Sequence, residues 1–312
     1  MASYNQTWFS LIGFRVTPPL QLCIFSLLFL VYIFSLLGNL VTITIITIHQ
    51  HLQTPMYFFL RNLAILDICF SSSTVPKLLI NLMSGDESIS FNLCMLQLYF
   101  YISVGSTIFY TLALLSLDRY IAICHPLRYN TLLPIQLCTK LVISGWVFGF
   151  LEFILVVFLI SQLDWCSSSV AIDHFFCDGS TILHLSCSNT DLVEKIYFCF
   201  ASITIFGSFI PTLSSYCFII STVLNISSST GRRKMFSTCS SHFLAVSIAY
   251  GCCIFIYVRP AGNVSTSNEK TVAVFNSVLT PLLHPLIYTL RNQAVINGLK
   301  VTLKSIRYGS YK

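Results

Sequence analysis

The chain has 312 residues, of which 55% are hydrophobic and only 9% are charged, and its mean hydropathy is +0.79. Water does not disperse such a composition, which is typical of proteins that span a lipid bilayer. Its net charge of +6 comes from only 17 basic residues, too few for a surface that follows nucleic-acid phosphates. The composition therefore excludes a soluble enzyme with a tail anchor and a nucleic-acid-binding protein built on surface charge.

Seven apolar runs, bounded by polar or turn residues, follow one another along the chain. Each is long enough for a spanning helix, which needs about 20 mainly apolar residues. An amphipathic tail at 292–306 fits a helix lying in the membrane interface. We expect an all-α membrane protein in which residues 1–312 form a single seven-transmembrane domain. The seven runs cover residues 22–48, 57–81, 93–124, 140–161, 194–225, 235–258 and 271–291.

The distribution of Lys and Arg predicts the orientation of the bundle. With the N-terminus outside, twelve of the 17 basic residues fall on the cytoplasmic side. Asn5, in the motif Asn5-Gln6-Thr7, is then an accessible N-glycosylation site. The sequence predicts a multi-pass plasma-membrane protein with an extracellular N-terminus and a cytoplasmic C-terminus. The twelve residues are Arg61, Arg119, Arg128, Lys140, Arg232, Arg233, Lys234, Arg291, Lys300, Lys304, Arg307 and Lys312.

Most of the thirteen cysteines lie inside apolar runs, where we interpret them as small buried hydrophobic residues. Four stand at the expected outer side, namely Cys94, Cys166, Cys177 and Cys187. An oxidising compartment favours disulfides, and the three possible pairings of four cysteines stay open. A zinc site is the less favoured alternative, because secretory thiols normally oxidise. Its ligands would be His174, Cys177, His184 and Cys187.

Polar side chains at membrane depth are costly unless they face the bundle interior, so each is a candidate functional residue. From their matching depth, Asn39, Asp67 and His284 are expected to form a hydrogen-bonded polar centre between the first, second and seventh helices. A structural, water-filled pocket without a switching role is the alternative. Glu152, in the fourth run, either faces a pocket or lies protonated against a neighbouring helix, and the sequence does not decide between them.

The third run ends in Asp118, Arg119 and Tyr120, at the expected cytoplasmic boundary. An acid and a base in adjacent positions hold an interaction that can be exchanged for the contacts of a partner protein. The alternative is a lone Arg119 that reaches toward the membrane interface.

Prolines interrupt two of the runs. Pro211 lies in the fifth run, and Pro281 and Pro285 lie in the seventh. Each removes a backbone hydrogen bond and allows a kink that tertiary contacts or water must repair.

Six short motifs accompany these runs: Gly38-Asn39, Leu52–Leu60 (LQTPMYFFL), Asp118–Tyr129 (DRYIAICHPLRY), Ser214–Tyr216 (SSY), Lys234–His242 (KMFSTCSSH) and Pro285–Asn292 (PLIYTLRN). Together they resemble the vertebrate olfactory receptors, a family of rhodopsin-like G-protein-coupled receptors. The resemblance runs from about Asn5 to Asn297, nearly the whole chain, and the combination of motifs is highly specific. The outer segment His174–Asp178 (HFFCD) is similar to the larger, tetrapod-type class.

The resemblance implies two disulfides, Cys94 with Cys177 and Cys166 with Cys187, that close an outer lid over the mouth of the bundle. It also implies that the sixth helix swings outward and opens a cytoplasmic cleft for a stimulatory, olfactory-type G protein, which raises cAMP. The residues that it implies in coupling and switching are Asp118, Arg119, Tyr120, Tyr216, Lys234 and Tyr288.

The resemblance further implies an odorant site between the third, fifth, sixth and seventh helices. Helical spacing agrees, because the implied residues of the third and of the sixth helix each share one helix face. Aromatic, aliphatic and small side chains with a few hydroxyls suit an apolar volatile of roughly ten heavy atoms. No cofactor and no metal is expected. The implied lining residues are Tyr101, Ile102, Gly105, Ser106, Phe200, Thr204, Tyr250, Cys253, Ile254, Tyr257 and Ser277.

Two positions depart from the family pattern. His284 stands before Pro285 where the family has Asn, so the hydrogen bonds around Asp67 must be rebuilt, and titration of His284 would make them sensitive to pH. Leu117 replaces the tyrosine that usually precedes Asp118, which removes a hydroxyl near the switch.

Other classes of membrane protein fit less well. A retinal protein needs a Schiff-base lysine in the seventh run, and Thr271 to Leu290 contains none. A transporter usually shows repeated halves and several midplane charges. No nucleophile motif joins the Ser, His and Asp residues into a hydrolase, so no enzyme is expected. The main alternative is a rhodopsin-like receptor for a non-odorant metabolite expressed outside the nose.

Overall fold

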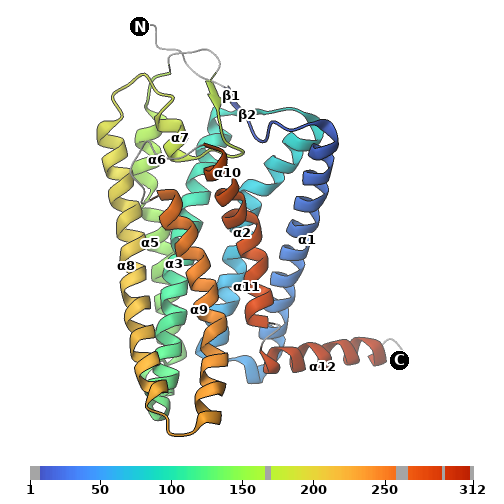
Figure 1. The fold of residues 1–312 in the computed structure, drawn as a ribbon, viewed down its shortest axis with the longest axis vertical. Coiled ribbons are helices and arrows are strands. Elements are labelled where there is room, and N and C mark those ends of the chain that lie inside the picture. Colours follow the sequence, from blue (N-terminus) through green and yellow to red (C-terminus); the bar gives the residue numbers. More distant parts are fainter. Residues whose placement is uncertain (1–7, 166–169, 258–265, 290–291, 310–312) are drawn as a thin grey trace.

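In the computed structural model, a bundle of long helices carries a small sheet at one end and a helix across the other (Figure 1). We call these the strand end and the α12 end. The structure describes residues 8–165, 170–257, 266–289 and 292–309, without the side chains of residues 231, 233–238, 240–241, 256–257, 266–269, 289 and 306–309.

The long helices account for all seven predicted spans. Six helical segments are long and apolar enough to cross a membrane, and the remaining helix, α9, has a shorter apolar stretch, His242–Phe255, within the described residues. The predicted fold class, an all-α membrane bundle, is confirmed. The helices are α1 (Pro18–Ile48), α2 (Pro55–Ser84), α3 (Phe91–Cys124), α5 (Ile135–Leu151) with α6 (Ile154–Ser161), α8 (Asp191–Leu224), α9 (Ser229–Tyr257), and α10 (Thr266–Val274) with α11 (Thr280–Thr289).

The fourth span differs from the single helix predicted over 140–161. It begins at Ile135 and breaks at Glu152 and Phe153, because the backbone of Phe153 (φ −100°, ψ 1°) leaves the helical region there. The carbonyl of Phe150, just before the break, accepts a hydrogen bond from the Tyr99 hydroxyl at 2.9 Å. A neighbouring helix thus satisfies a carbonyl at the break, as a bilayer requires.

The seventh span is also divided, as its prolines predicted. A π-helical stretch, Phe275–Leu279, separates α10 from α11, directly before Pro281. The carbonyl of Pro281 would normally bond the amide of residue 285, which is a proline and has no N–H. Asn39 repairs this gap, since its Nδ2 donates to the Pro281 carbonyl at 2.9 Å. Gly38 permits the approach, because a Cβ there would lie 3.2 Å from Cγ of Pro285.

Local sequence explains several helix ends. Two prolines begin α1, where a missing N–H costs nothing, and Gly85 ends α2 in the left-handed conformation at φ 70°. Ser90 caps α3 by accepting the Leu93 amide at 3.4 Å. Short elements complete the connections: 3₁₀ turns at Gln50–Leu52 and Pro126–Arg128, α4 (Tyr129–Leu132) and α7 (Gly179–Leu183).

Three strands form a small sheet at the strand end, in the order β2-β1-β3. The central strand, β1 (Trp8–Leu11), pairs antiparallel with β2 (Ser88–Ser90) and parallel with β3 (Val170–Ile172). In register, Phe9 lies opposite both Ile89 and Val170. The sheet therefore joins the N-terminal segment, the α2–α3 connection and the α6–α8 connection over the bundle.

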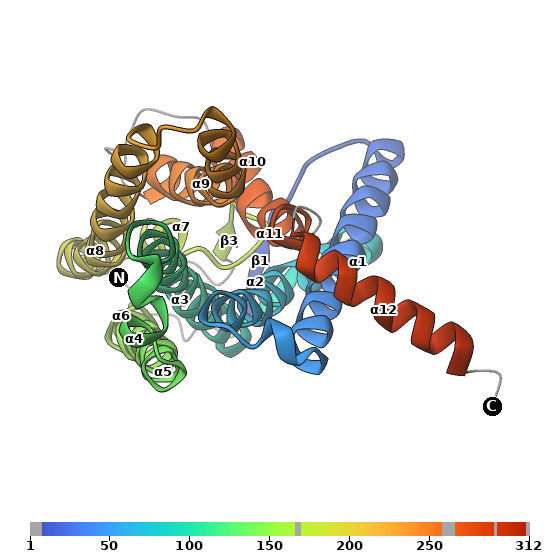
Figure 2. The same ribbon diagram turned by 90° about the horizontal axis from the view of Figure 1, so that it is seen from below.

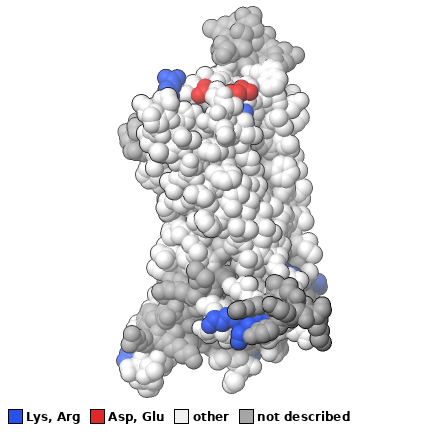
Figure 3. Space-filling model, turned by 90° about the vertical axis from the view of Figure 1, so that its right-hand side faces the viewer, with Lys and Arg blue, Asp and Glu red and all other residues white. Residues whose placement is uncertain are grey.

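At the opposite end, α12 (Gln293–Gly309) leaves the bundle almost at right angles and passes α1 (Figures 1 and 2). Side chains of His49 and Thr302 join the two helices through a 3.0 Å hydrogen bond. Viewed from this end, α3 lies among α2, α5 and α8 (Figure 2). On the face drawn in Figure 3, charged side chains gather at the two ends, and the described part of the middle is an uncharged band. Such a band suits the hydrocarbon region of a bilayer.

The buried apolar residues form two clusters of unequal size. The larger runs from the strand end through the centre of the bundle, from Phe9 and Leu11 to Val295. The smaller lies between α8 and α9, in the halves of these helices nearer the α12 end, and contains Tyr216, Ile219, Val223 and Cys239. Within the described residues, these two helices therefore have a separate core near the α12 end.

Candidate functional site

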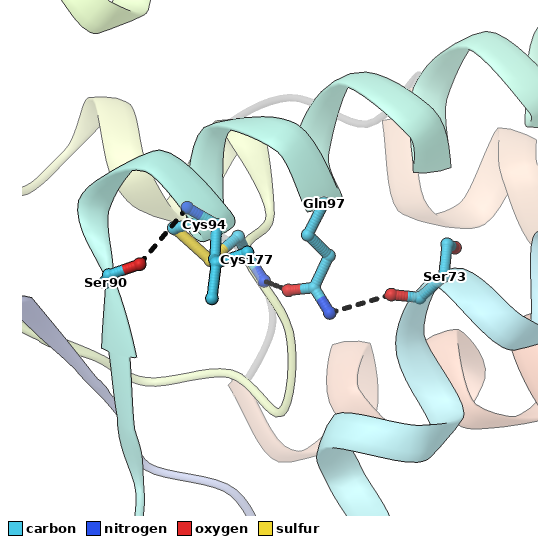
Figure 4. The surroundings of a disulfide bond; sticks show 6 residues. Ser73, Ser90, Cys94, Gln97 and Cys177 are labelled. Carbon is cyan, nitrogen blue, oxygen red and sulfur yellow. Dashed lines mark hydrogen bonds between the residues drawn. A yellow bond between two sulfur atoms is a disulfide. The ribbon is translucent and has the colours of Figure 1, made fainter.

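A lid formed by residues 170–187 is attached to the strand-end mouth of the bundle. Cys177 is disulfide-bonded to Cys94 of α3, the pairing that the resemblance implied. Gln97, one turn along α3, accepts the Cys177 amide at 3.0 Å and donates to the Ser73 carbonyl of α2 at 2.9 Å (Figure 4). One covalent bond and one side-chain bridge thus fix the lid to α3 and α2.

The other predicted lid ligands do not form a metal site. Both Cys177 and Cys187 are disulfide-bonded, and Cys166 lies outside the described residues. His174 is buried, whereas His184 is exposed. No cluster of three His, Cys, Asp or Glu side chains suited to a metal occurs in the described part of the chain. The zinc alternative is therefore wrong, because its thiols are oxidised.

Aromatic rings form the underside of the lid. His174, Phe175 and Phe176 are all at most 5% exposed, and the Phe176 ring lies 4.4 Å from the ring of Tyr101 on α3. Burial lowers the pKa of His174 to about 4, and the charge of Lys270 also lowers it, whereas Asp178 and Asp173 raise it. The imidazole is therefore neutral at physiological pH.

Lys270 ties the lid to the seventh span, which sequence analysis did not anticipate. Its ammonium lies 2.5 Å from Asp173 of the lid and 3.3 Å from the carbonyls of Ile12 and Gly13. Lys270 is 8% exposed, whereas the Asp173 side chain is 52% exposed. A single cation thus joins the N-terminal segment, the lid and α10. No pattern along the chain pairs these residues.

Beneath the lid lies a cavity of about 80 Å³ between α2, α3, the α5–α6 break, α8, α9 and the seventh span. It exceeds by several times the roughly 10–15 Å³ that one water molecule requires. Six of the predicted ligand-binding residues line it: Tyr101, Ile102, Gly105, Ser106, Thr204 and Cys253.

Four predicted lining residues lie outside this wall. Tyr250 is buried between the rings of Phe109 and Phe209, at 4.9 and 5.1 Å, and Ile254 is 37% exposed. On α9 the wall uses Ala249 together with the implied Cys253, so the side of the helix that faces the cavity lies toward Ala249 and away from Tyr250 and Ile254.

Phe200 packs its ring 6.3 Å from Phe153, behind the wall. Ser277 is fully buried and donates its hydroxyl to the Ala273 carbonyl of its own helix at 2.7 Å. Tyr257 belongs to α9, but its side chain lies outside the described residues. The residues that the resemblance implied thus lie on helices that surround the cavity, but only six of them line its wall.

Several lining residues were not anticipated. Some of them enter the wall where helices are irregular, as with Phe153 at the α5–α6 break and Asn276 in the π-helical stretch, and the others come from α2, α8 and regular turns of α3, α9 and α11. Local irregularity carries no periodic signal in the sequence. The additional residues are Asp67, Phe70, Ile108, Phe109, Phe153, Tyr197, Ala201, Ile205, Ala249, Asn276, Thr280, Pro281 and His284.

Glu152 accepts hydrogen bonds from hydroxyls of two other helices. Ser106 and Tyr110 of α3 donate to Oε2 at 3.1 and 2.9 Å, and Thr204 of α8 donates to Oε1 at 2.7 Å. Because Ser106 and Thr204 also line the cavity, Glu152 stands directly behind its wall. Glu152 thus lies against two neighbouring helices and contacts the cavity wall from behind.

Asp67 and His284 form the floor of the cavity. Nδ1 of His284 lies 2.9 and 3.0 Å from the two carboxylate oxygens of Asp67, and both residues are at most 2% exposed. Nε2 of His284 has no hydrogen-bond partner within the described residues. The same pair borders a second cavity of about 10 Å³ that Asn39 and Tyr288 also line. Asn39 joins this centre through the Pro281 carbonyl and not through Asp67.

At the α12 end, Asp118 is fully buried and bonds two neighbours. Nη2 of Arg119 lies 2.8 Å from one carboxylate oxygen, and the hydroxyl of Tyr129 donates to the other at 2.5 Å. Burial, reinforced by the charge of Asp118, raises the pKa of the Tyr129 phenol far above its usual value, so this phenol remains a donor. Tyr120 points elsewhere, and its hydroxyl lies 3.2 Å from His125.

A chain of rings connects the floor to the smaller core cluster. Tyr216 of α8 hydrogen-bonds His242 of α9, and the Tyr288 ring lies 5.8 Å from His242 and 6.0 Å from His284. Lys234 also belongs to α9, but its side chain lies outside the described residues. The implied switch residues Tyr216 and Tyr288 therefore lie between the cavity floor and the α12 end.

The geometry can be compared with known proteins. The family model for "Olfactory receptor" matches residues 28–305. Human olfactory receptor 6C76 is 45% identical over 306 residues, which are 98% of this chain and 97% of that protein. Human olfactory receptor 6C3 is 46% identical over 94% of both chains, and human olfactory receptor 2AP1 is 43% identical over 96% of this chain and 97% of its own.

The chain belongs to the olfactory receptor family. It is therefore an odorant-sensing G-protein-coupled receptor with seven transmembrane helices, and not an enzyme. Membership makes it a multi-pass membrane protein whose partners are an odorant and a heterotrimeric G protein. In this olfactory receptor, the buried cavity lies beside the central turns of α3, and the Asp118–Arg119 pair lies near the C-terminal end of the same helix.

Proposed function

We propose that this receptor binds small, mostly apolar volatile molecules in the cavity beneath the lid and activates a stimulatory, olfactory-type G protein that raises cAMP. The observation that carries the proposal is the cavity itself, which is enclosed by aromatic, aliphatic and small side chains and has the Asp67–His284 pair as its floor. Burial of apolar area at about 25 cal/mol per Å² gives a volatile of roughly ten heavy atoms micromolar affinity after the cost of immobilisation.

The proposal includes the orientation of the bundle, with the strand end extracellular. Two features support it: the disulfide of Cys94 and Cys177 needs an oxidising compartment, and the α12 end carries the Arg119 motif and the basic tail. Asn5, which precedes the described residues, would then be available for glycosylation at the plasma membrane.

In this mechanism, an odorant acts by binding the active arrangement better than the resting one, since equal affinity shifts no equilibrium. A ligand in the cavity contacts the floor formed by Asp67 and His284. The ring of His284 lies 6.0 Å from the ring of Tyr288. Tyr288 and Tyr216 both lie beside His242 of α9. Movement of α9 would open the α12 end, with Arg119 and Lys234 available to the G protein.

A cAMP reporter screen tests the proposal in cells that express the full-length receptor with the olfactory G protein. The informative variant is Gly105→Leu, because a Cβ at this position already lies 3.4 Å from Phe70 and the larger side chain must enter the cavity. Overpacking of this kind costs about 1–3 kcal/mol, so sensitivity to an agonist should fall about tenfold or more.

The matched control is Ile254→Ala, since Ile254 is 37% exposed and lies outside the cavity wall. This variant should keep the agonist response at equal surface expression. A Gly105→Leu receptor that responds normally would place the odorant elsewhere. A ligand response without any change in cAMP would contradict the coupling.

A further inference from the structure

Glu152 has an unusual set of hydrogen-bond partners for an acidic side chain at membrane depth. No ion pair to Glu152 occurs among the described side chains. The carboxylate instead receives the hydroxyls of Ser106, Tyr110 and Thr204, at 2.7–3.1 Å. A carboxylate can only accept hydrogen bonds, so each of the three hydroxyls must direct its single hydrogen toward Glu152.

Two of these hydroxyls belong to the cavity wall. Ser106 is 4% exposed and Thr204 is 3% exposed, and their oxygens lie 3.4 Å apart across the α3–α8 contact. A hydroxyl has one hydrogen and two lone pairs. Because both hydrogens point toward Glu152, Ser106 and Thr204 can offer a ligand only their lone pairs. They therefore act as hydrogen-bond acceptors.

We propose, on the basis of the odorant cavity proposed above, that Ser106 and Thr204 form an acceptor edge that selects volatiles carrying an O–H or N–H donor. Alcohols and protonated amines fit this edge, whereas an ether of the same shape brings its own lone pairs against those of the wall. Glu152 acts as a positioning residue, since it sets the direction of both hydroxyls without lining the cavity itself.

The strength of this selection follows from ordinary hydrogen-bond energies. A neutral donor that finds an acceptor in a buried site gains about fivefold in affinity over a ligand that leaves the acceptor unpaired. A protonated amine forms a charge-assisted bond and also lies near the negative charge of Glu152, so its advantage is about tenfold or more. The expected order of potency is amine, then alcohol, then ether.

The test compares matched triplets of volatiles in cells that express the full-length receptor. Each triplet has one carbon skeleton of roughly ten heavy atoms and carries a primary amine, an alcohol or a methyl ether. The measured quantity is the ratio of half-maximal concentrations within a triplet in the cAMP assay. For the wild-type receptor, the amine and the alcohol should be about fivefold or more potent than the ether.

Substitution Glu152→Gln should turn one of the two wall acceptors into a hydrogen-bond donor. The amide has nearly the same size but carries N–H donors, which bond a wall oxygen and release its hydroxyl hydrogen toward the cavity. The ether should gain potency, and the advantage of the donor ligands should fall below about twofold. Where Glu152→Gln does not reach the cell surface, Ser106→Ala and Thr204→Val remove the acceptors directly and should also remove the donor preference.

Tyr110→Phe is the matched control. It deletes a hydroxyl that bonds the same carboxylate but does not line the cavity, so the donor preference should persist. If Tyr110→Phe abolished the preference as completely as Glu152→Gln, a general structural role for Glu152 would replace the acceptor edge. Persistence of the preference in Glu152→Gln, or in both direct variants, would also overturn it.

The outcomes separate this inference from the function on which it rests. A wild-type receptor that responds to volatiles through cAMP, but equally to ethers and to donor ligands, contradicts the acceptor edge alone. A receptor at the cell surface that responds to no volatile contradicts the odorant cavity, and the acceptor edge with it.

Discussion

The two ends of the bundle are held together by different kinds of interaction. At the strand end, a disulfide, an ion pair and a three-stranded sheet join segments that are far apart in the sequence. The inner halves of α8 and α9, near the α12 end, meet through a small core cluster and the hydrogen bond between Tyr216 and His242. In the described part of the chain, no disulfide joins α8 to α9.

This difference indicates which end can move. The lid and cavity belong to one continuous buried cluster, so a displacement there would disturb packing along the whole bundle. Separation of α9 from α8 near the α12 end exposes only the small cluster. We therefore expect the cavity to stay rigid while the α12 end opens. Substitutions at the two ends test this difference between a rigid strand end and a mobile α12 end.

The largest expected effect comes from the disulfide. Cys94 and Cys177 are 83 positions apart in the chain, and loss of a native disulfide typically costs about 2–5 kcal/mol. Cys94→Ser should therefore abolish most surface expression and lower the thermal midpoint of purified receptor. Cys199→Ser, which alters an exposed free cysteine of α8, is the control and should change neither quantity. Normal stability without the disulfide would mean that the strand end is held mainly by its sheet and ion pair.

Acid should weaken the same end through His174. The ordinary pKa of histidine is 6.5, whereas burial holds that of His174 at about 4. Between these values the unfolded chain binds a proton that the folded lid does not. The contribution of His174 to the free energy of unfolding is therefore fully present above about pH 6.5. It is lost as the pH falls toward 4, which lowers the free energy of unfolding by on the order of 3 kcal/mol.

Thermal midpoints measured from pH 7 to pH 5 check this loss. His174→Gln should flatten the pH dependence, and His184→Gln, at an exposed position of the lid, should leave it unchanged. Equal slopes for the wild type and His174→Gln would show that His174 does not carry the acid sensitivity.

Removal of one bond at the α12 end should change signalling more than stability. Tyr129→Phe deletes the donor to Asp118 and leaves the Arg119 pair in place. Because a hydrogen bond to a charged group contributes about 1.5–3 kcal/mol, loss of even part of it in the resting state should raise basal cAMP about threefold or more.

Basal cAMP, normalised to surface expression, is the readout for Tyr129→Phe. Tyr32→Phe serves as the control, since its hydroxyl bonds Ser72 of α2, away from the Asp118–Arg119 pair, and should leave basal cAMP near the wild-type level. A lower basal signal in Tyr129→Phe would assign this bond to the active arrangement.

The sequence predicted the rigid features of the molecule better than the irregular ones. Apolar runs located all seven spans, and Pro285 predicted the disturbance that Asn39 repairs. The break at Glu152 was missed because the apolar pattern continues through it on both sides. Contacts with other helices stabilise the break. The Tyr99 hydroxyl donates to the Phe150 carbonyl, and three hydroxyls donate to the carboxylate of Glu152.

The cavity shows a similar limit. Spacing identifies residues that share a helix face, but it does not fix the rotation of that face relative to the bundle axis. On α9 the implied Cys253 lines the wall, whereas Ala249 lines it in place of Tyr250. Asn276 lines it through a π-helical stretch whose register departs from 3.6 residues per turn. Tertiary packing decides both, and a single sequence does not record it.

The smallest effect is expected at the ion pair of the strand end. Lys270→Met removes the cation that joins Asp173 to the carbonyls of Ile12 and Gly13. Because the Asp173 side chain is 52% exposed, water solvates it after the change, and the loss should be about 1 kcal/mol or less. The half-maximal odorant concentration should then rise about twofold, and Lys195→Met, at an exposed position of α8, should leave it unchanged.

The size of this last effect shows whether the disulfide or the ion pair holds the lid more strongly. If the disulfide holds the lid, Lys270→Met must be milder than Cys94→Ser in both surface expression and thermal midpoint. The reverse order would mean that the cation, and not the covalent bond, keeps the lid over the cavity. The strand end would then be held by charge that salt can screen, so raising the ionic strength should weaken odorant responses of the wild type but not of Lys270→Met.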